Sequence, residues 1–192
     1  MNGEELARQA LREAAAAHHL AEADTAPIVA AADLVVTSLR AGGTLLVFGN
    51  GGSALDAQHV ASELVNRFER SRRALAALAL TTDASVVTSI ANDDSFERVF
   101  ARQIEGLGRR GDVALGISTS GQSANVLAGL ETARQAGLAT VALTGHDGGR
   151  LGTLADVHVN VASRSTARVQ EVHRTLLHVF CDLVERAFTA GD

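Results

Sequence analysis

Apolar residues in the chain fall into five short runs, each of strand length and bounded by residues that favour turns. These runs predict strands at 44–48, 76–80, 112–118, 138–143 and 157–161. Longer segments with apolar residues at helical spacing lie before, between and after the strands. They predict helices at 2–22, 27–41, 54–68, 83–91, 95–107, 124–137 and 166–188.

Strands therefore alternate with helices across residues 44–188, which predicts an α/β fold. We expect a three-layer α/β/α sandwich in which a parallel sheet has helices on both faces. No linker or low-complexity segment divides residues 1–192, so we expect one domain, with N-terminal helices in 1–43 and the α/β core in 44–192. In such sheets, ligands bind beyond the carboxyl ends of the strands.

A glycine-rich turn, Gly49–Ser53, separates the first predicted strand from its helix. Ser53 is a candidate N-cap, and Asp56 three residues later completes a weak capping box. A helix that begins after such a turn points backbone N–H groups and a positive dipole end at an anion. The turn matches neither the P-loop nor the dinucleotide-binding fingerprint, and similar turns occur without a ligand.

The turn after the third predicted strand, Ser118–Ser123, carries four hydroxyl side chains within six residues and precedes another helix. Hydroxyl and backbone N–H groups at a helix N-terminus can surround a phosphate without any cation. A serine-rich helix cap is the alternative, and the density of hydroxyls favours the anion site.

His59 and Glu63 lie four residues apart on the predicted helix 54–68, so they share one face. An imidazole and a carboxylate at this spacing could bind one metal or divide acid–base work. They could equally be an ordinary helix pair.

The last predicted helix, 166–188, carries two apolar stripes at helical spacing. The first contains Val169, Val172, Leu176, Leu183 and Ala187, and the second contains Leu177, Cys181, Val184 and Phe188. A helix that is apolar on two sides requires burial on two sides. We expect one stripe to face the sheet and the other to face another subunit.

Composition excludes several classes of function. The net charge is −5, so no basic surface indicates a nucleic-acid partner, and no apolar run of about 18 residues predicts a membrane span. The single cysteine, Cys181, allows no intramolecular disulfide, and we expect a cytoplasmic protein. All 17 basic residues are arginine, which excludes Schiff-base chemistry and a P-loop lysine.

Three motifs, taken in order, carry a resemblance to a known family. They are Gly49–Ser53 with Asp56, His59 and Glu63; Gly116–Gly121 with Ser123 and Asn125; and Gln170–His173 with His178. Together they closely resemble the phosphoheptose isomerases of the sugar-isomerase (SIS) superfamily, from the first helix to the last. One departure is Gln122, where asparagine is usual.

The resemblance implies a flavodoxin-like SIS fold with a five-stranded parallel sheet, assembled as a homotetramer with active sites at subunit contacts. It implies isomerisation of D-sedoheptulose 7-phosphate to D-glycero-D-manno-heptose 7-phosphate through an enediol, the first step of nucleotide-activated heptose biosynthesis. It also implies a zinc ion held by His59, Glu63, Gln170 and His178, with Glu63 and His178 as the acid–base pair. The implied substrate-binding residues are Asn50, Gly51, Gly52, Glu63, Asn92, Asp93, Ser118, Thr119, Ser120, Ser123 and Gln170.

Two points remain open at this stage. Gln170 and His178 lie eight residues apart, or about 12 Å along a regular helix. They could reach one metal by pointing toward each other, through a break in the helix, or from different subunits. The alternative function is a non-catalytic SIS protein that binds a sugar phosphate or the replication initiator, although such a protein has no reason to keep all four ligands.

Overall fold

The computed structural model describes residues 2–189 and contains the predicted parallel sheet. Its five strands lie in the order β2-β1-β3-β4-β5, with every neighbouring pair parallel. Their bounds are β1 Leu45–Gly49, β2 Ala77–Ala79, β3 Val113–Ser118, β4 Ala139–Gly145 and β5 Val157–Val161. This is the strand order of flavodoxin-like folds, so the predicted fold class is confirmed.

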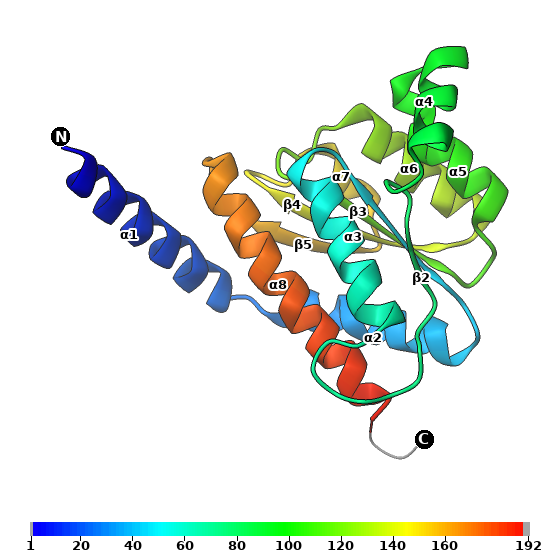
Figure 1. Ribbon diagram of the computed structural model, residues 1–192, viewed down its shortest axis with the longest axis horizontal. Coiled ribbons are helices and arrows are strands. Elements are labelled where there is room, and N and C mark those ends of the chain that lie inside the picture. The colour runs from blue at the N-terminus through cyan, green and yellow to red at the C-terminus, as the bar shows by residue number, and fades with distance from the viewer. Residues whose placement is uncertain (1, 190–192) are drawn as a thin grey trace.

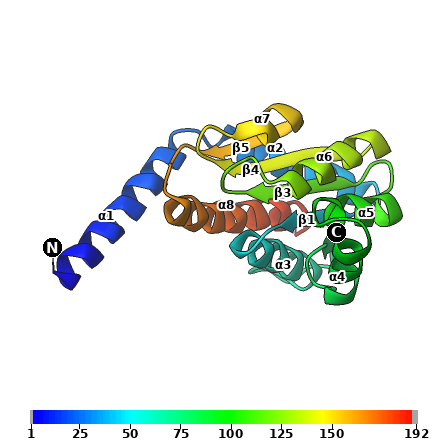
Figure 2. The same ribbon diagram turned by 90° about the horizontal axis from the view of Figure 1, so that it is seen from above.

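Helices cover both faces of the sheet and form three layers (Figure 1, Figure 2). Their bounds are α1 Gly3–Glu22, α2 Ala26–Arg40, α3 Gly52–Val65, α4 Ala84–Asp93, α5 Val99–Leu107, α6 Ala124–Ala136, α7 Gly149–Leu154 and α8 Thr166–Ala187, with a 3-10 turn, η1, at Phe96–Arg98. The core on one face includes α2, α3 and α8, and the core on the other includes α5, α6 and α7. Helix α1 projects from the body of the molecule (Figure 1, Figure 2).

Strand β1 shows why continuous apolar runs form this sheet. Leu45 and Val47 pack into the core beneath α2, α3 and α8, whereas Leu46 and Phe48 pack into the opposite core. Successive strand residues point to opposite faces, and a parallel sheet between two helical layers buries both. An uninterrupted apolar run is therefore the expected pattern for these strands.

The structure corrects three predicted boundaries. Helix α3 begins at Gly52, and its N-cap is Gly51 rather than Ser53, which makes no capping hydrogen bond. Helix α4 ends at Asp93, so it includes Asn92 and Asp93 beyond the predicted end at residue 91. A short helix, α7, lies between β4 and β5, where the sequence predicts no helix.

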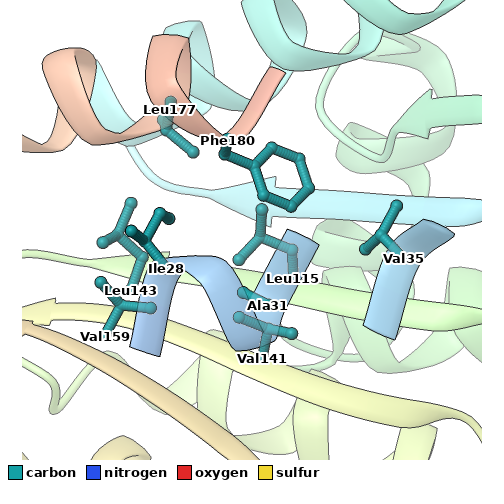
Figure 3. A pocket seen from close by; sticks show the side chains of 9 residues that line it. All are labelled: Ile28, Ala31, Val35, Leu115, Val141, Leu143, Val159, Leu177 and Phe180. Atoms are coloured by element: carbon teal, nitrogen blue, oxygen red, sulfur yellow. The ribbon is translucent and has the colours of Figure 1, made fainter. Parts of the chain in front are cut away.

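The prediction that one stripe of the last helix faces another subunit is wrong. Leu177, Cys181 and Val184, from the second stripe, are all buried within the single chain. Leu177 and Phe180 of α8 point toward Ile28 of α2 and the sheet, around an apolar cavity of only about 10 Å³ (Figure 3). Helix α2 supplies the second covering surface, so the apolar pattern of α8 gives no evidence about subunits.

Among residues 2–189, no helix is both long enough and apolar enough to cross a membrane.

Candidate active site

The two predicted ligand turns lie side by side at the carboxyl edge of the sheet. The register pairs Gly49 of β1 with Ile117 of β3, so the chain leaves both strands at the same level. Directly beyond them, Asn50 and Asn125 exchange two amide hydrogen bonds of 2.8 Å each. This reciprocal pair fixes the first turn to the start of α6, which follows the second turn.

The Ser118–Ser123 turn gathers hydroxyl groups around tight backbone. The Oγ atoms of Ser118 and Ser123 are 2.9 Å apart, and Ser120 Oγ accepts the N–H of Gln122 at 3.2 Å. Gly121 has a φ of +64°, and a Cβ there would lie 2.1 Å from the carbonyl oxygen of Gly148. Only glycine suits this position, and Ser120 and Ser123 remain partly accessible to an incoming anion.

Helices α3 and α8 run side by side in the layer that covers one face of the sheet (Figure 1). Residues at helical spacing on α3 meet partners at helical spacing on α8, and we call this polar line of contacts the α3–α8 seam. Its members are Gly52, Asp56, His59 and Glu63 on α3, and Gln170, Arg174 and His178 on α8.

Three of the predicted site residues converge within this seam. The Nε2 atoms of His59 and His178 are 2.9 Å apart, and Glu63 Oε1 lies 3.6 Å from His59 Nε2. The side chain of Glu63 is 19% exposed, so it is shielded yet reachable from solvent. The ring of Phe68 lies 5.6 Å from that of His178.

An ion pair next to this cluster, between the buried Asp56 and the partly exposed Arg174, was missed by the sequence analysis. Asp56 Oδ1 lies 2.7 Å from Arg174 Nη2, while Asp56 Oδ2 is buried without a hydrogen-bond partner among the described residues. Burial raises the pKa of Asp56, although Arg174 opposes that shift. Burial, followed by the charge of Arg174, lowers the pKa of His59, which favours the neutral imidazole that a metal requires.

His59, Glu63 and His178 offer suitable donors for zinc, but their spacing is not that of a preformed metal site. Within residues 2–189, no three His, Cys, Asp or Glu side chains have such an arrangement. Two nitrogens bound to one tetrahedral zinc lie roughly 3.3 Å apart, compared with the 2.9 Å found here. A small rotation of either ring would open the required space, so this donor set fits the ion.

Gln170 does not join the other three candidate ligands within one chain. Its side chain lies over Gly52, where an added Cβ would come within 1.5 Å of Gln170 Nε2. Gly52 and His59 are about 10 Å apart along α3, and α8 is unbroken between Gln170 and His178. Within one chain, the side chains of Gln170 and His178 therefore do not point toward each other, and no break in α8 brings them together.

Asn92 and Asp93 lie at the exposed end of α4, where Asn92 donates a hydrogen bond of 2.8 Å to Asp93. Within residues 2–189, no hydrogen bond or ion pair joins the side chains of this pair to the α3–α8 seam. His173, although part of the third motif, is buried and has its Nε2 2.8 Å from the carbonyl oxygen of Thr144. It links α8 to β4.

Comparison with known proteins identifies the family of the chain. The chain matches the SIS domain over residues 11–145. It is 57% identical over 159 residues to a phosphoheptose isomerase of Roseiflexus sp. (strain RS-1), covering 83% of this chain and 81% of that protein.

Two solved structures of phosphoheptose isomerases share the fold along nearly the whole chain. The protein from Neisseria gonorrhoeae superimposes with a TM-score of 0.92 at 42% identity, covering 96% of this chain and 100% of that one. The protein from Francisella tularensis gives 0.93 at 35% identity, covering 97% and 100%. The chain therefore belongs to the phosphoheptose isomerase family of SIS-domain proteins, and it is an aldose–ketose isomerase.

Proposed function

We propose that the protein interconverts D-sedoheptulose 7-phosphate and D-glycero-D-manno-heptose 7-phosphate, and so supplies nucleotide-activated heptose biosynthesis. The observation that carries this proposal is the convergence of His59, Glu63 and His178 on the α3–α8 seam. The relatives from Roseiflexus sp. and Neisseria gonorrhoeae described above are named phosphoheptose isomerases, which supports the choice of a heptose phosphate.

The substrate phosphate binds at the turn Ser118–Ser123 in this proposal. The turn offers hydroxyl groups and the N-terminus of α6, both of which favour an anion. Asn50, Gly51 and Gly52 adjoin the turn and would contact the sugar, together with Gln170. Asn92 and Asp93 would approach the substrate from the end of α4 of this or another subunit.

Isomerisation moves a proton between neighbouring carbons, which requires a base for the carbon-bound proton and an acid near the carbonyl oxygen. Glu63 is the base, because its carboxylate is shielded but not enclosed. His178 is the acid, since its ring nitrogen faces the same small space as that carboxylate. Phe68 lies against His178 and limits access of water to it.

We further propose that His59, Glu63 and His178 hold zinc, with Gln170 of a second subunit as the fourth ligand. Zinc, when bound, would occupy His178 Nε2 and would take over the role of that nitrogen as the acid, because it supplies a positive charge that stabilises the enediolate. Metal analysis of protein purified without chelators should find one zinc per active site, and full activity in metal-free protein would contradict this part of the proposal.

The proposed site has two parts, the phosphate turn and the cluster of His59, Glu63 and His178, and the distance between them supports a site shared between subunits. Glu63 lies about 16 Å along α3 from Gly52, which adjoins the phosphate turn. We propose that the phosphate turn of one subunit faces the His59, Glu63 and His178 cluster of another, within a homotetramer. Leu6, Leu11 and Leu20 on α1 are 55–72% exposed, and burial of these side chains would favour such an assembly.

Incubation of the protein with sedoheptulose 7-phosphate, followed by NMR of the sugar, tests the proposed reaction. We expect conversion to an aldose phosphate. A non-catalytic protein of the same fold would bind the sugar phosphate without converting it, and NMR would then detect no new sugar. Conversion of a shorter sugar phosphate alone would retain the reaction type and contradict the proposed substrate.

A further inference from the structure

The segment 66–76, between α3 and β2, covers a buried ion pair that has no part in the site described above. Arg72 lies on this segment, and Glu185 lies in the last turn of α8. Neither side chain has any exposed area, and Arg72 Nε is 3.5 Å from Glu185 Oε1.

Arg72 completes the C-terminal end of α3. Its Nη2 donates to the carbonyl oxygen of Glu63 at 2.7 Å, and its Nη1 donates to those of Leu64 at 2.8 Å and Asn66 at 3.0 Å. Carbonyl groups in the last turn of a helix have no partner within the helix, and a cation there is favourable. The guanidinium group therefore fixes the turn of α3 that carries Glu63.

Glu185 fixes residues 68–70 of the same segment. Its carboxylate accepts three successive backbone N–H groups, from Phe68 at 2.9 Å, Glu69 at 2.8 Å and Arg70 at 2.7 Å. Successive N–H groups around an anion form a well-defined nest. The first of these residues, Phe68, places its ring against His178.

Stability alone gives little reason for such a pair, because apolar side chains of similar volume often stabilise a core equally well. The location of the pair suggests another reason. One partner holds the backbone at Glu63, and the other holds the residue that packs on His178.

We propose that Arg72 and Glu185 are positioning residues, which together set the position of Glu63 relative to His178. This inference rests on the proposed function, in which those two side chains transfer the proton. Small displacements of reacting groups lower turnover strongly, whereas substrate affinity depends mainly on the phosphate turn, which lies on other elements.

The test is the double variant Arg72→Met/Glu185→Gln, which removes both charges and leaves neither buried charge unpaired. We expect kcat to fall about 10- to 100-fold while KM stays within about twofold. The single variant Arg72→Lys keeps both charges but loses the forked contacts with the carbonyl groups of α3, and it should give an intermediate loss of kcat. It also keeps the test decisive if the double variant fails to fold.

Asp112→Asn is the matched control. Asp112 is also a buried carboxylate, and it accepts the backbone N–H groups of Thr44 and Arg109 at 2.8 Å each, neither of which lies on α3 or α8. This variant should lower the melting temperature and leave kcat within about twofold, because it weakens the fold without moving the seam.

Glu63→Gln, assayed alongside, separates the two possible failures. If Glu63→Gln is inactive while the folded Arg72 and Glu185 variants keep the wild-type kcat, the positioning role is overturned and the proposed function stands. An equal loss of kcat in Asp112→Asn would also overturn the positioning role, since the effect would then be a general one. Full turnover in Glu63→Gln would defeat the proposed function and this inference with it.

Discussion

Ser120 carries one of the accessible hydroxyls of the phosphate turn, and its Oγ accepts the N–H of Gln122. Contacts to a phosphate exist in both the ground state and the transition state. Ser120→Ala should therefore raise KM for the sugar phosphate more than it lowers kcat. Steady-state kinetics measures both values. A variant that loses turnover at unchanged KM would assign the turn a different role.

His173 makes stability depend on pH. Burial lowers its pKa from 6.5 to about 4, so the unfolded chain binds this proton more readily than the folded one. As the pH falls from about 6.5 to about 4, this residue should lower the free energy of unfolding by roughly 3 kcal/mol in total.

Urea unfolding across that pH range, compared with His173→Gln, measures this contribution. Glutamine cannot be protonated but can still donate to the carbonyl oxygen of Thr144. The difference in stability between the two proteins should therefore change with pH in the stated direction. Parallel pH curves for the two proteins would show that His173 is not the group responsible.

At the residue scale, the sequence predicts that His59 and Glu63 share one helix face, and the structure confirms it. The pairing of Asp56 with Arg174 could not be predicted, because it depends on how α3 aligns with α8. Helical spacing defines the face of each helix, but the relative position of two helices along their axes is set by tertiary packing.

At the element scale, Leu177 tests how α8 is packed. It is 1% exposed and points into the small cavity between α8, α2 and the sheet (Figure 3). Leu177→Ala should lower the free energy of unfolding by about 2–5 kcal/mol, because it enlarges that cavity. Chemical denaturation measures the loss. If Leu177→Ala lowers the free energy of unfolding by less than about 1 kcal/mol and also reduces the number of subunits in the assembly, the packing described here for the second stripe of α8 would be contradicted.

The same helix shows where sequence patterns stop being informative. Two apolar stripes on residues 166–188 correctly indicate burial on two sides, but they do not identify the covering element. Helix α2 provides that cover within the chain.

The sequence predicts that α3 begins after Ser53, whereas the helix begins at Gly52. The reason is local. Gly51 adopts a φ of +55°, which glycine tolerates, and so the turn ends before it reaches Ser53.

The positions of β1 and β3 are predicted well, because both strands are buried along their whole length and are therefore largely apolar. Helix α7 was not predicted, since its six residues, two of them glycine, carry too little apolar periodicity to be distinguished from a loop.

At the scale of the whole molecule, the proposed shared site makes a distinctive prediction. Glu63→Gln removes the base, and Ser120→Asp places a negative charge where the phosphate is proposed to bind. Each variant alone should be inactive. Co-expressed as hybrid oligomers, they should regain part of the activity, because some sites then combine an intact phosphate turn with an intact Glu63.

Mass spectrometry of the assembled protein establishes that the hybrids form. Hybrids that form and remain inactive would show that one chain supplies both halves of the site. That result would also contradict the proposal that Gln170 of a second subunit is the fourth zinc ligand.

Deuterium incorporation from solvent tests the central claim most directly. When sedoheptulose 7-phosphate is incubated with the protein in D₂O, proton transfer by Glu63 through an enediol should place deuterium on the carbon next to the carbonyl, as NMR detects. Glu63→Gln should slow both incorporation and conversion by roughly 10²- to 10⁴-fold, with the fold intact by circular dichroism. Conversion and deuterium incorporation at wild-type rates in Glu63→Gln, or the absence of both in the wild-type protein, would contradict the account.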